Sequence, residues 1–166
     1  MLKVILIRGL AASGKTTLCN KIKNDNPTYY TWSKDVLFDD FLLKGVEWNL
    51  ANKKVYEHLF DLIKTEKQMD RVLVVDAPYR KKKDHEKLIT FCKHLDVSIK
   101  SVLVTCSDEE EWRARFKQRS LDPQPNQTIT DYDDMKGLYG SMHIEPAIGE
   151  FVFDSCGDIE VQYKKL

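Results

Sequence analysis

The chain has 166 residues, a length that suits one domain with a single sizeable core. It carries 26 lysines and arginines and 26 aspartates and glutamates, so its overall charge does not mark it as a nucleic-acid or membrane binder. Hydrophobic residues make up 42% and charged residues 31%, as in ordinary globular proteins, and no stretch has the ~20 apolar residues that cross a bilayer.

Apolar runs and turn residues predict strands and helices that alternate along the chain. Val4 to Ile7 and Val72 to Val75 are continuous apolar runs, the pattern of strands buried on both faces of a sheet. The other predicted elements, in chain order, are a helix at 15–24, a strand at 28–32, helices at 36–43, 48–67 and 82–95, a strand at 98–105, helices near 109–119 and 131–141, and a strand at 151–153. We expect residues 159–163 to add an edge strand.

Two of these helices begin with capping signals. Ser33 and Asp35 both suit the N-cap of the helix that starts near Val36. Ser107, with Glu110 three positions later, has the capping-box pattern and opens the helix that follows.

The alternation predicts an α/β fold of three layers, with a parallel sheet of about five strands and helices on both faces. We expect one domain over residues 1–166. Ligands of such sheets gather at the carboxyl ends of the strands. Four candidate groups follow strands or lie on the next segment, namely residues 9–16, Asp35, Asp76, and Arg115 with Arg119.

The most informative segment runs from Gly9 to Thr16 and matches the phosphate-binding pattern G-x-x-x-x-G-K-[ST] in full. Its place between a strand and a helix argues against a chance match and predicts a P-loop NTPase fold. Backbone N–H groups and the helix N-terminus would surround the phosphates of ATP, Lys15 would contact the β and γ phosphates, and Thr16 would bind Mg²⁺. The residues expected to bind the nucleotide are Gly9, Ala12, Ser13, Gly14, Lys15, Thr16 and Thr17.

Asp76 ends the apolar run 72–75 and stands in the place of a Walker-B acid. There it would bind Mg²⁺ through water or orient the loop. The alternative is a turn or cap aspartate before Pro78.

Three further side chains are candidates for the transfer step. Asp35 is placed to accept a proton from an attacking hydroxyl, or else only caps its helix. Arg115 and Arg119 share one helix face with Trp112 and precede a loop with two prolines, as in a mobile lid at about 115–130. The alternative is a solvated helix whose arginines pair with Glu109 to Glu111, and Arg113 fits such a surface pair best.

The run Arg80 to Lys83 is the one basic cluster, and it suits either an anionic substrate or a solvated helix start. The four cysteines have no metal-binding spacing and are interpreted as buried small side chains, which favours a reducing, cytoplasmic location. They are Cys19, Cys92, Cys106 and Cys156.

Together these residues resemble the small AAA-type P-loop kinases that include the 5′-kinase domain of phage-type polynucleotide kinases. The resemblance covers most of the chain and implies that Lys15 and Thr16 bind the donor phosphates and Mg²⁺, and that Asp35 is the general base. It also implies that Arg115 lies near the donor nucleotide and that Arg119 reaches the transferring phosphate.

The sequence departs from polynucleotide kinases at one position, because an arginine that grips the acceptor phosphate in that family is replaced here by Phe38. Lys34 is the nearest candidate substitute, but it lies on the other side of Asp35 in the sequence. A kinase of a small hydroxylated molecule is therefore a close alternative.

We therefore predict an ATP-dependent kinase acting on a hydroxyl acceptor, with a nucleic-acid 5′ end as the first candidate and no membrane partner. A nucleotide-dependent switch or motor fits less well. The GTPase pattern N-K-x-D fails at Val55, and Ala77 stands where motor ATPases carry a glutamate. The sequence gives no oligomeric state.

Overall fold

The structure, a computed structural model, describes residues 1–166. Its strands are β1 (Lys3–Arg8), β2 (Tyr30–Ser33), β3 (Val72–Asp76), β4 (Ser98–Thr105) and β5 (Phe151–Asp154). Its helices are α1 (Lys15–Asp25), α2 (Lys34–Leu43), α3 (Trp48–Glu66), α4 (Lys82–His94), α5 (Glu109–Ser120), α6 (Tyr132–Tyr139) and α7 (Ile159–Tyr163).

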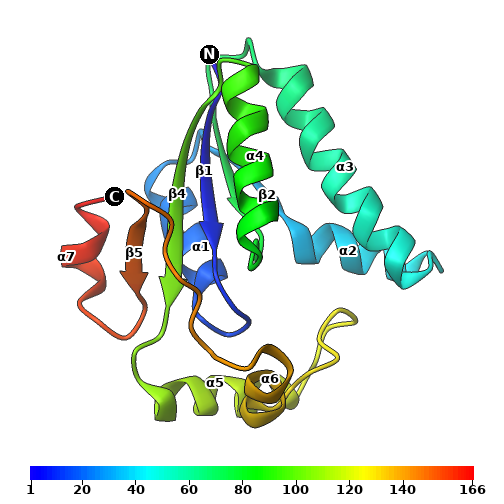
Figure 1. Ribbon diagram of the computed structural model, residues 1–166, viewed down its shortest axis with the longest axis vertical. Coiled ribbons are helices and arrows are strands. Elements are labelled where there is room, and N and C mark those ends of the chain that lie inside the picture. The colour runs from blue at the N-terminus through cyan, green and yellow to red at the C-terminus, as the bar shows by residue number, and fades with distance from the viewer.

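The strands form one parallel sheet in the order β2-β3-β1-β4-β5, which confirms the predicted three-layer α/β fold with a five-stranded sheet. Ser33 and Ile7 both pair with Asp76, so three strands end at nearly the same level. All strands point downward in Figure 1, and α5 and α6 lie below their carboxyl ends. This edge of the sheet is the one where a ligand site is expected.

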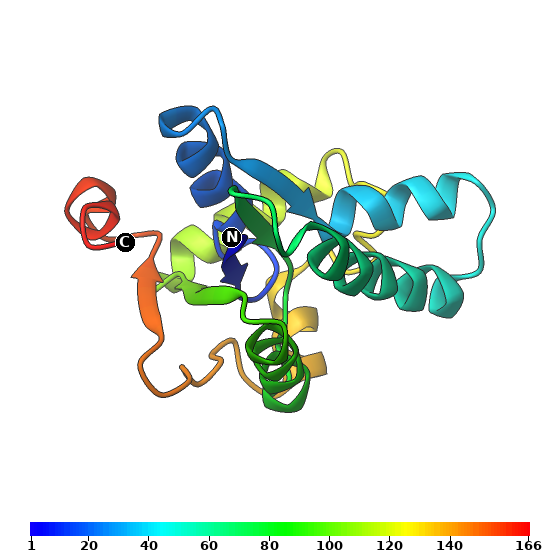
Figure 2. The ribbon, with the colours of Figure 1, turned by 90° about the horizontal axis from the view of Figure 1, so that it is seen from above.

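Three apolar clusters hold the layers together. Neighbouring strand residues point to opposite faces, so Leu6 packs toward α2, α3 and α4, whereas Ile7 packs toward α1. Figure 2 shows α1 and α4 on opposite sides of β1. A third cluster, centred on Trp112 and Phe116 of α5, lies beneath the sheet and includes Leu10 of the phosphate loop. Packing therefore ties α5 directly to the loop.

The cap residues differ in part from those predicted. Ser33 is the N-cap of α2 and accepts the N–H of Val36 at 3.5 Å, which leaves Asp35 in the first turn. The prediction of a capping box at Ser107 is wrong, because Asp108 caps α5 and accepts the N–H of Glu111 at 3.0 Å. The shift by one residue frees the N–H of Ser107 to donate to Asp154 Oδ1 at 3.0 Å, which links β4 to β5.

The predicted edge strand at 159–163 is also wrong, because these residues form helix α7. Asp158 caps this helix and accepts the N–H of Val161 at 2.9 Å. Gln162 then exchanges hydrogen bonds with the backbone N–H and carbonyl of Asp154, at 2.7 and 2.9 Å. The Gln162 side chain thus satisfies both backbone polar groups of the last residue of β5, at the edge of the sheet.

A buried cluster, which we call the Arg8 clasp and which consists of Arg8, His85, Ser101 and Glu150, fixes the start of the phosphate loop. Arg8 donates to both carboxylate oxygens of Glu150, at 2.6 and 2.5 Å, and Ser101 donates to the same carboxylate at 2.6 Å. His85 Nε2 lies 2.9 Å from Ser101 Oγ. The clasp joins β1, α4, β4 and the segment before β5 directly beside Gly9.

No helix is both long enough and apolar enough to cross a membrane.

Candidate active site

The phosphate loop joins β1 to α1, as predicted, and its conformation depends on two glycines. Gly9 has φ +151° and packs so closely on the Val104 carbonyl that a Cβ atom there would clash. Gly14 is the N-cap of α1 at φ 102°, and a Cβ atom there would lie 2.8 Å from Ser155 Cβ. Only glycine fits these positions without strain. Ser13, between them, is fully buried and its hydroxyl has no hydrogen-bond partner.

Lys15 is held over the loop that precedes it. Its Nζ donates to the Leu10 carbonyl at 2.8 Å. Burial lowers the pKa of Lys15, and this effect is opposed by the carboxylates of Asp76 and Asp35. The positive charge of Arg119 also lowers the pKa of Lys15, which shows that these two cations lie close together. Two partly buried cations that line one cleft favour an anionic ligand.

Thr16 and Asp76 form the candidate magnesium site. Thr16 Oγ1 donates to Asp76 Oδ2 at 2.8 Å. Burial raises the pKa of Asp76, while Lys15 and the Thr16 hydrogen bond oppose that shift. No group of three or more His, Cys, Asp or Glu side chains is arranged to bind a metal. A hydroxyl and one carboxylate fit Mg²⁺ that arrives with a nucleotide, because this ion takes its other ligands from phosphates and water.

A cleft of about 920 Å³ extends from the phosphate loop to α2, α3 and the loop after α5. It brings together residues that lie far apart in the sequence. The predicted site residues that line it are Ala12, Gly14, Lys15, Thr16, Thr17, Asp35, Arg115 and Arg119. Gly9, Ser13 and Asp76 do not line the cleft but lie behind its wall, where they shape the loop and contact Thr16.

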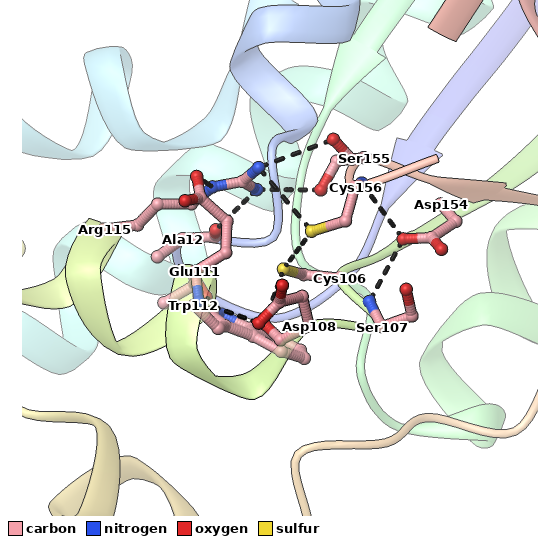
Figure 3. Close-up of polar contacts among 11 residues, drawn as sticks. Ala12, Cys106, Ser107, Asp108, Glu111, Trp112, Arg115, Asp154, Ser155 and Cys156 are labelled. Carbon is pink, nitrogen blue, oxygen red and sulfur yellow. Dashed lines mark hydrogen bonds and ion pairs between the residues drawn. The ribbon is translucent and has the colours of Figure 1, made fainter. Parts of the chain in front are cut away.

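Arg115 is fixed against the phosphate loop (Figure 3). Its Nη1 donates to Ser155 Oγ at 2.7 Å and lies 3.5 Å from the carbonyl oxygen of Ala12. Its Nε donates to Glu111 at 2.9 Å, so the alternative of an intrahelical pair also holds in part. Arg113 pairs with Glu109 and Asp133 on the surface, which confirms its predicted role.

Arg119 has a different environment one turn further along α5. Its Nε is buried and has no hydrogen-bond partner. Burial lowers the pKa of Arg119, and Asp35 and Asp39 oppose this shift from across the cleft. The guanidinium therefore keeps an unpaired Nε–H close to the second cation, Lys15.

Asp35 lies in the cleft at the first turn of α2, and its side chain is 49% exposed. Lys34 Nζ lies 3.5 Å from Asp35 Oδ1 and 3.8 Å from the centre of the Phe38 ring. Phe38 itself is fully buried and packs edge-on against Trp48. Although Lys34 precedes Asp35 in the sequence, its long side chain folds back and places a cation over residue 38.

The basic run after β3 divides into two parts. Arg80 lines the cleft and its guanidinium carbon lies 4.0 Å from the centre of the Tyr139 ring. The three lysines that follow are exposed, and Lys82 pairs with Glu86 at 3.8 Å. Only the first member of the run therefore belongs to the site.

The sequence did not predict one contact between two residues of this region. Asp39 of α2 accepts hydrogen bonds from Asn126 in the loop after α5. They are 87 positions apart, and neither stands in a motif. No local pattern could have paired them, since only the folded chain brings α2 and this loop together.

The AAA domain family matches residues 4–137, which is most of the chain. The fold is similar to that of a Chloroflexus aurantiacus protein named as a candidate kinase, with a TM-score of 0.76 and 17% identity over 98% of this chain and 96% of that chain. Chaetomium thermophilum Kti12, solved in complex with ADP-AlF3, gives a TM-score of 0.70 and 17% identity over 98% and 94% of the two chains. The Mycobacterium tuberculosis APS kinase CysC, in complex with AMPPNP and APS, gives 0.65 and 13% over 98% and 94%. A search of curated proteins found no match.

At these identities the structural likeness establishes the fold, which is that of the P-loop NTPases. The phosphate loop, the Thr16–Asp76 contact and the order of the strands all agree with it. The family match extends from β1 through most of α6 and thus includes every site residue named above except Ser155 and Tyr139. The chain belongs to the AAA domain family.

Proposed function

We propose that the protein is an ATP-dependent kinase that transfers the γ-phosphate to a hydroxyl group of an acceptor. The observation that carries this proposal is that the phosphate loop, Asp35 and Arg119 line one cleft, and that Arg119 Nε has no hydrogen-bond partner. A switch or motor needs no second polar half in its cleft, whereas a kinase needs a place for the acceptor.

On the donor side, the loop N–H groups, the start of α1 and Lys15 would bind the phosphates. Thr16 and Asp76 would hold Mg²⁺, which when bound supplies positive charge to the donor phosphates. Two similar proteins were solved with ADP-AlF3 and with AMPPNP, which supports a nucleotide donor. Arg115, fixed beside Ala12, would contact the nucleotide next to the loop.

On the acceptor side, Asp35 would take the proton of the attacking hydroxyl as the new oxygen–phosphorus bond forms and the bond to the ADP oxygen breaks. Arg119 would donate to the phosphoryl oxygens in transit, and its desolvated position makes that interaction stronger than it would be in water. Most of the rate enhancement then comes from positioning and charge, as in other phosphoryl transfers.

The acceptor half of the cleft favours an anionic acceptor with a ring. Lys34 and Arg80 place two cations near Asp35, and Trp48 and Tyr139 add aromatic surface. A nucleic-acid 5′ end fits this set, with Lys34 over Phe38 in place of the arginine that polynucleotide kinases carry. A small phosphorylated or carboxylated metabolite is the second candidate, because the same cations would bind its anionic group and residues 126–128 of the loop after α5 add polar side chains to the cleft.

Labelled ATP and a panel of acceptors test the proposal. The panel contains a single-stranded oligonucleotide with a free 5′-hydroxyl, nucleosides, nucleoside 3′-phosphates and sugars. We expect label in one class and a loss of transfer in Lys15→Met. Transfer to an oligonucleotide should weaken steeply with salt, whereas transfer to a small acceptor should change little. Retention of full transfer by Lys15→Met would exclude the proposed donor site.

Asp35→Asn tests the base. We expect kcat to fall by about 10²-fold with little change in ATP affinity, because the carboxylate acts on the acceptor only. Asp40→Asn is the matched control, since Asp40 lies on the same helix with a similarly exposed side chain and pairs with Lys44 outside the cleft. Full activity of Asp35→Asn would show that the base assignment is wrong.

A further inference from the structure

The loop between α5 and α6 crosses toward α2 and is joined to it by one residue pair. Asp39 Oδ1 accepts the backbone N–H of Asn126 at 2.7 Å, and Asp39 Oδ2 accepts its side-chain Nδ2 at 2.7 Å. One carboxylate thus accepts a backbone N–H and a side-chain N–H of the same residue, and both bonds are partly buried. In Figure 1 this loop, drawn in yellow, rises from α5 and α6 toward the end of α2.

These two bonds are the main polar connection of the loop to the rest of the protein. Within residues 122–130, the other hydrogen bonds join Gln124 to Gln127 inside the loop. No hydrogen bond but the pair from Asn126 leaves this segment. Ile129, at its far end, packs on the apolar cluster of α5. The segment from Leu121 to Asn126 can therefore move away from α2 if its two hydrogen bonds to Asp39 break.

The pair lies where opening would matter. Asp39 follows Asp35 by one helical turn, so the same face of α2 carries both carboxylates. Arg119 lies in the last turn of α5, directly before the loop, and residues 126–129 line the cleft. The bonds between Asp39 and Asn126 thus connect the element that carries the proposed base with the element that carries the proposed phosphate-binding arginine.

We propose that Asp39 is a positioning residue: with Asn126 it forms a latch that closes the loop over the cleft and sets Arg119 opposite Asp35. This rests on the proposed function, because positioning matters only if a phosphoryl group moves between these side chains. Closure excludes water from the transfer site, and loss of the latch admits it. Substrates enter and products leave when the two bonds break.

An exchange of the two side chains tests the latch without changing net charge. Asn126→Asp sets one carboxylate against another, and Asp39→Ala removes both acceptors, so each of these single variants should break the latch. In the double variant Asp39→Asn/Asn126→Asp, the introduced amide still accepts the backbone N–H of residue 126 and donates to the introduced carboxylate. The backbone bond is then kept and only the side-chain bond is reversed, so the double variant should rescue Asn126→Asp.

Hydrogen–deuterium exchange of residues 121–130 without ligand is the first readout. We expect exchange to become about tenfold faster in each single variant and to return close to the wild-type rate in the double variant. The second readout is turnover. We expect each single variant to lose about 10- to 100-fold in kcat with the KM for ATP within about threefold, and to hydrolyse more ATP per phosphate transferred. Asp40→Asn again serves as the control, and circular dichroism checks the fold of each variant.

The outcomes separate the latch from the kinase itself. The proposed latch is wrong if the single variants keep the wild-type exchange rate and kcat, or if the double variant exchanges as fast and turns over as slowly as they do. Either result would leave the proposed phosphate transfer by the wild type untouched. If the wild type transfers no phosphate to any acceptor while loop exchange follows the expected rescue, the latch closes the loop and the proposed kinase function is wrong.

Discussion

Three residues in and around the cleft carry a buried polar atom that has no hydrogen-bond partner in the protein. Ser13 Oγ and Arg119 Nε are two of the three buried side-chain polar atoms that make no hydrogen bond, and Tyr79 Oη is the third. Each such group costs about 1–3 kcal/mol of folding free energy. In the proposed mechanism, a bound phosphoryl group would offer Arg119 a hydrogen-bond acceptor and would offset this cost.

Replacing Arg119 should therefore affect the transfer step. We expect Arg119→Met to lower kcat by about 10³-fold, because the charge that develops on the phosphoryl oxygens loses its desolvated partner. Rapid-quench measurement of transfer at saturating ATP checks this. Arg113→Met is the control on the same helix, since Arg113 pairs only with surface carboxylates. A variant at position 119 with kcat near the wild-type value would contradict the assigned role.

Gly9 should be intolerant of a side chain for a structural reason. Gly9→Ala places a Cβ atom against the Val104 carbonyl at a φ of +151°, so we expect a loss of about 1–3 kcal/mol in the free energy of unfolding. Urea denaturation measures it. Gly137→Ala is the matched control, because nothing lies within 4 Å of its added Cβ atom and alanine favours helix α6. Equal stability of the two variants would contradict the account of the loop.

At the scale of elements, the Arg8 clasp explains why the phosphate loop starts from a rigid base. Glu150 is almost fully buried, and burial acts to raise its pKa. The hydrogen bonds from Arg8 and Ser101 and the N–H of Ala147 overcome that effect, so the pKa of Glu150 is lowered. The carboxylate stays ionised and binds β1, β4 and the segment before β5 together.

The clasp also predicts a dependence of stability on pH. Burial, followed by the charge of Arg8, lowers the pKa of His85 below its ordinary value of 6.5. The unfolded chain therefore binds the proton first, so the contribution of His85 is complete above about pH 6.5 and is lost as the pH falls through that range toward the folded pKa. We expect the free energy of unfolding to fall between pH 7.5 and 5.5, and to fall less in His85→Gln. Urea denaturation at both pH values, with the exposed His143→Gln as control, checks this, and an identical slope in all three proteins would be evidence against it.

Strands and helices were predictable wherever one signal dominated. The apolar runs at 4–7 and 72–75 and the phosphate-loop pattern sufficed to predict β1, β3 and the loop between β1 and α1, because continuous burial and a fixed loop geometry leave few alternatives. Residues 159–163 were mistaken for a strand because apolar side chains at alternate positions also fit a short helix capped by Asp158. Asp39 with Asn126, and Lys34 over Phe38, depend on long-range packing or side-chain reach, which no local pattern encodes.

The whole molecule concentrates its chemistry at one edge of a parallel sheet. Its overall charge is zero, yet Lys15, Lys34, Arg80, Arg115 and Arg119 all line one cleft. Focusing of positive charge in a cleft attracts anions although the net charge does not. The sheet aligns the ends of β1, β2 and β3, and α5 with its loop encloses the space in front of them.

The central claim is that the loop from Gly9 to Thr16 binds the phosphates of a nucleotide with Mg²⁺, and titration calorimetry tests it most directly. We predict saturable binding of the nonhydrolysable analogue AMPPNP with Mg²⁺ at one site per chain, weakened strongly in Lys15→Met and little in the control Lys82→Met. A wild-type chain with an intact circular dichroism spectrum that gives no saturable heat with either adenine or guanine nucleotides would contradict the claim.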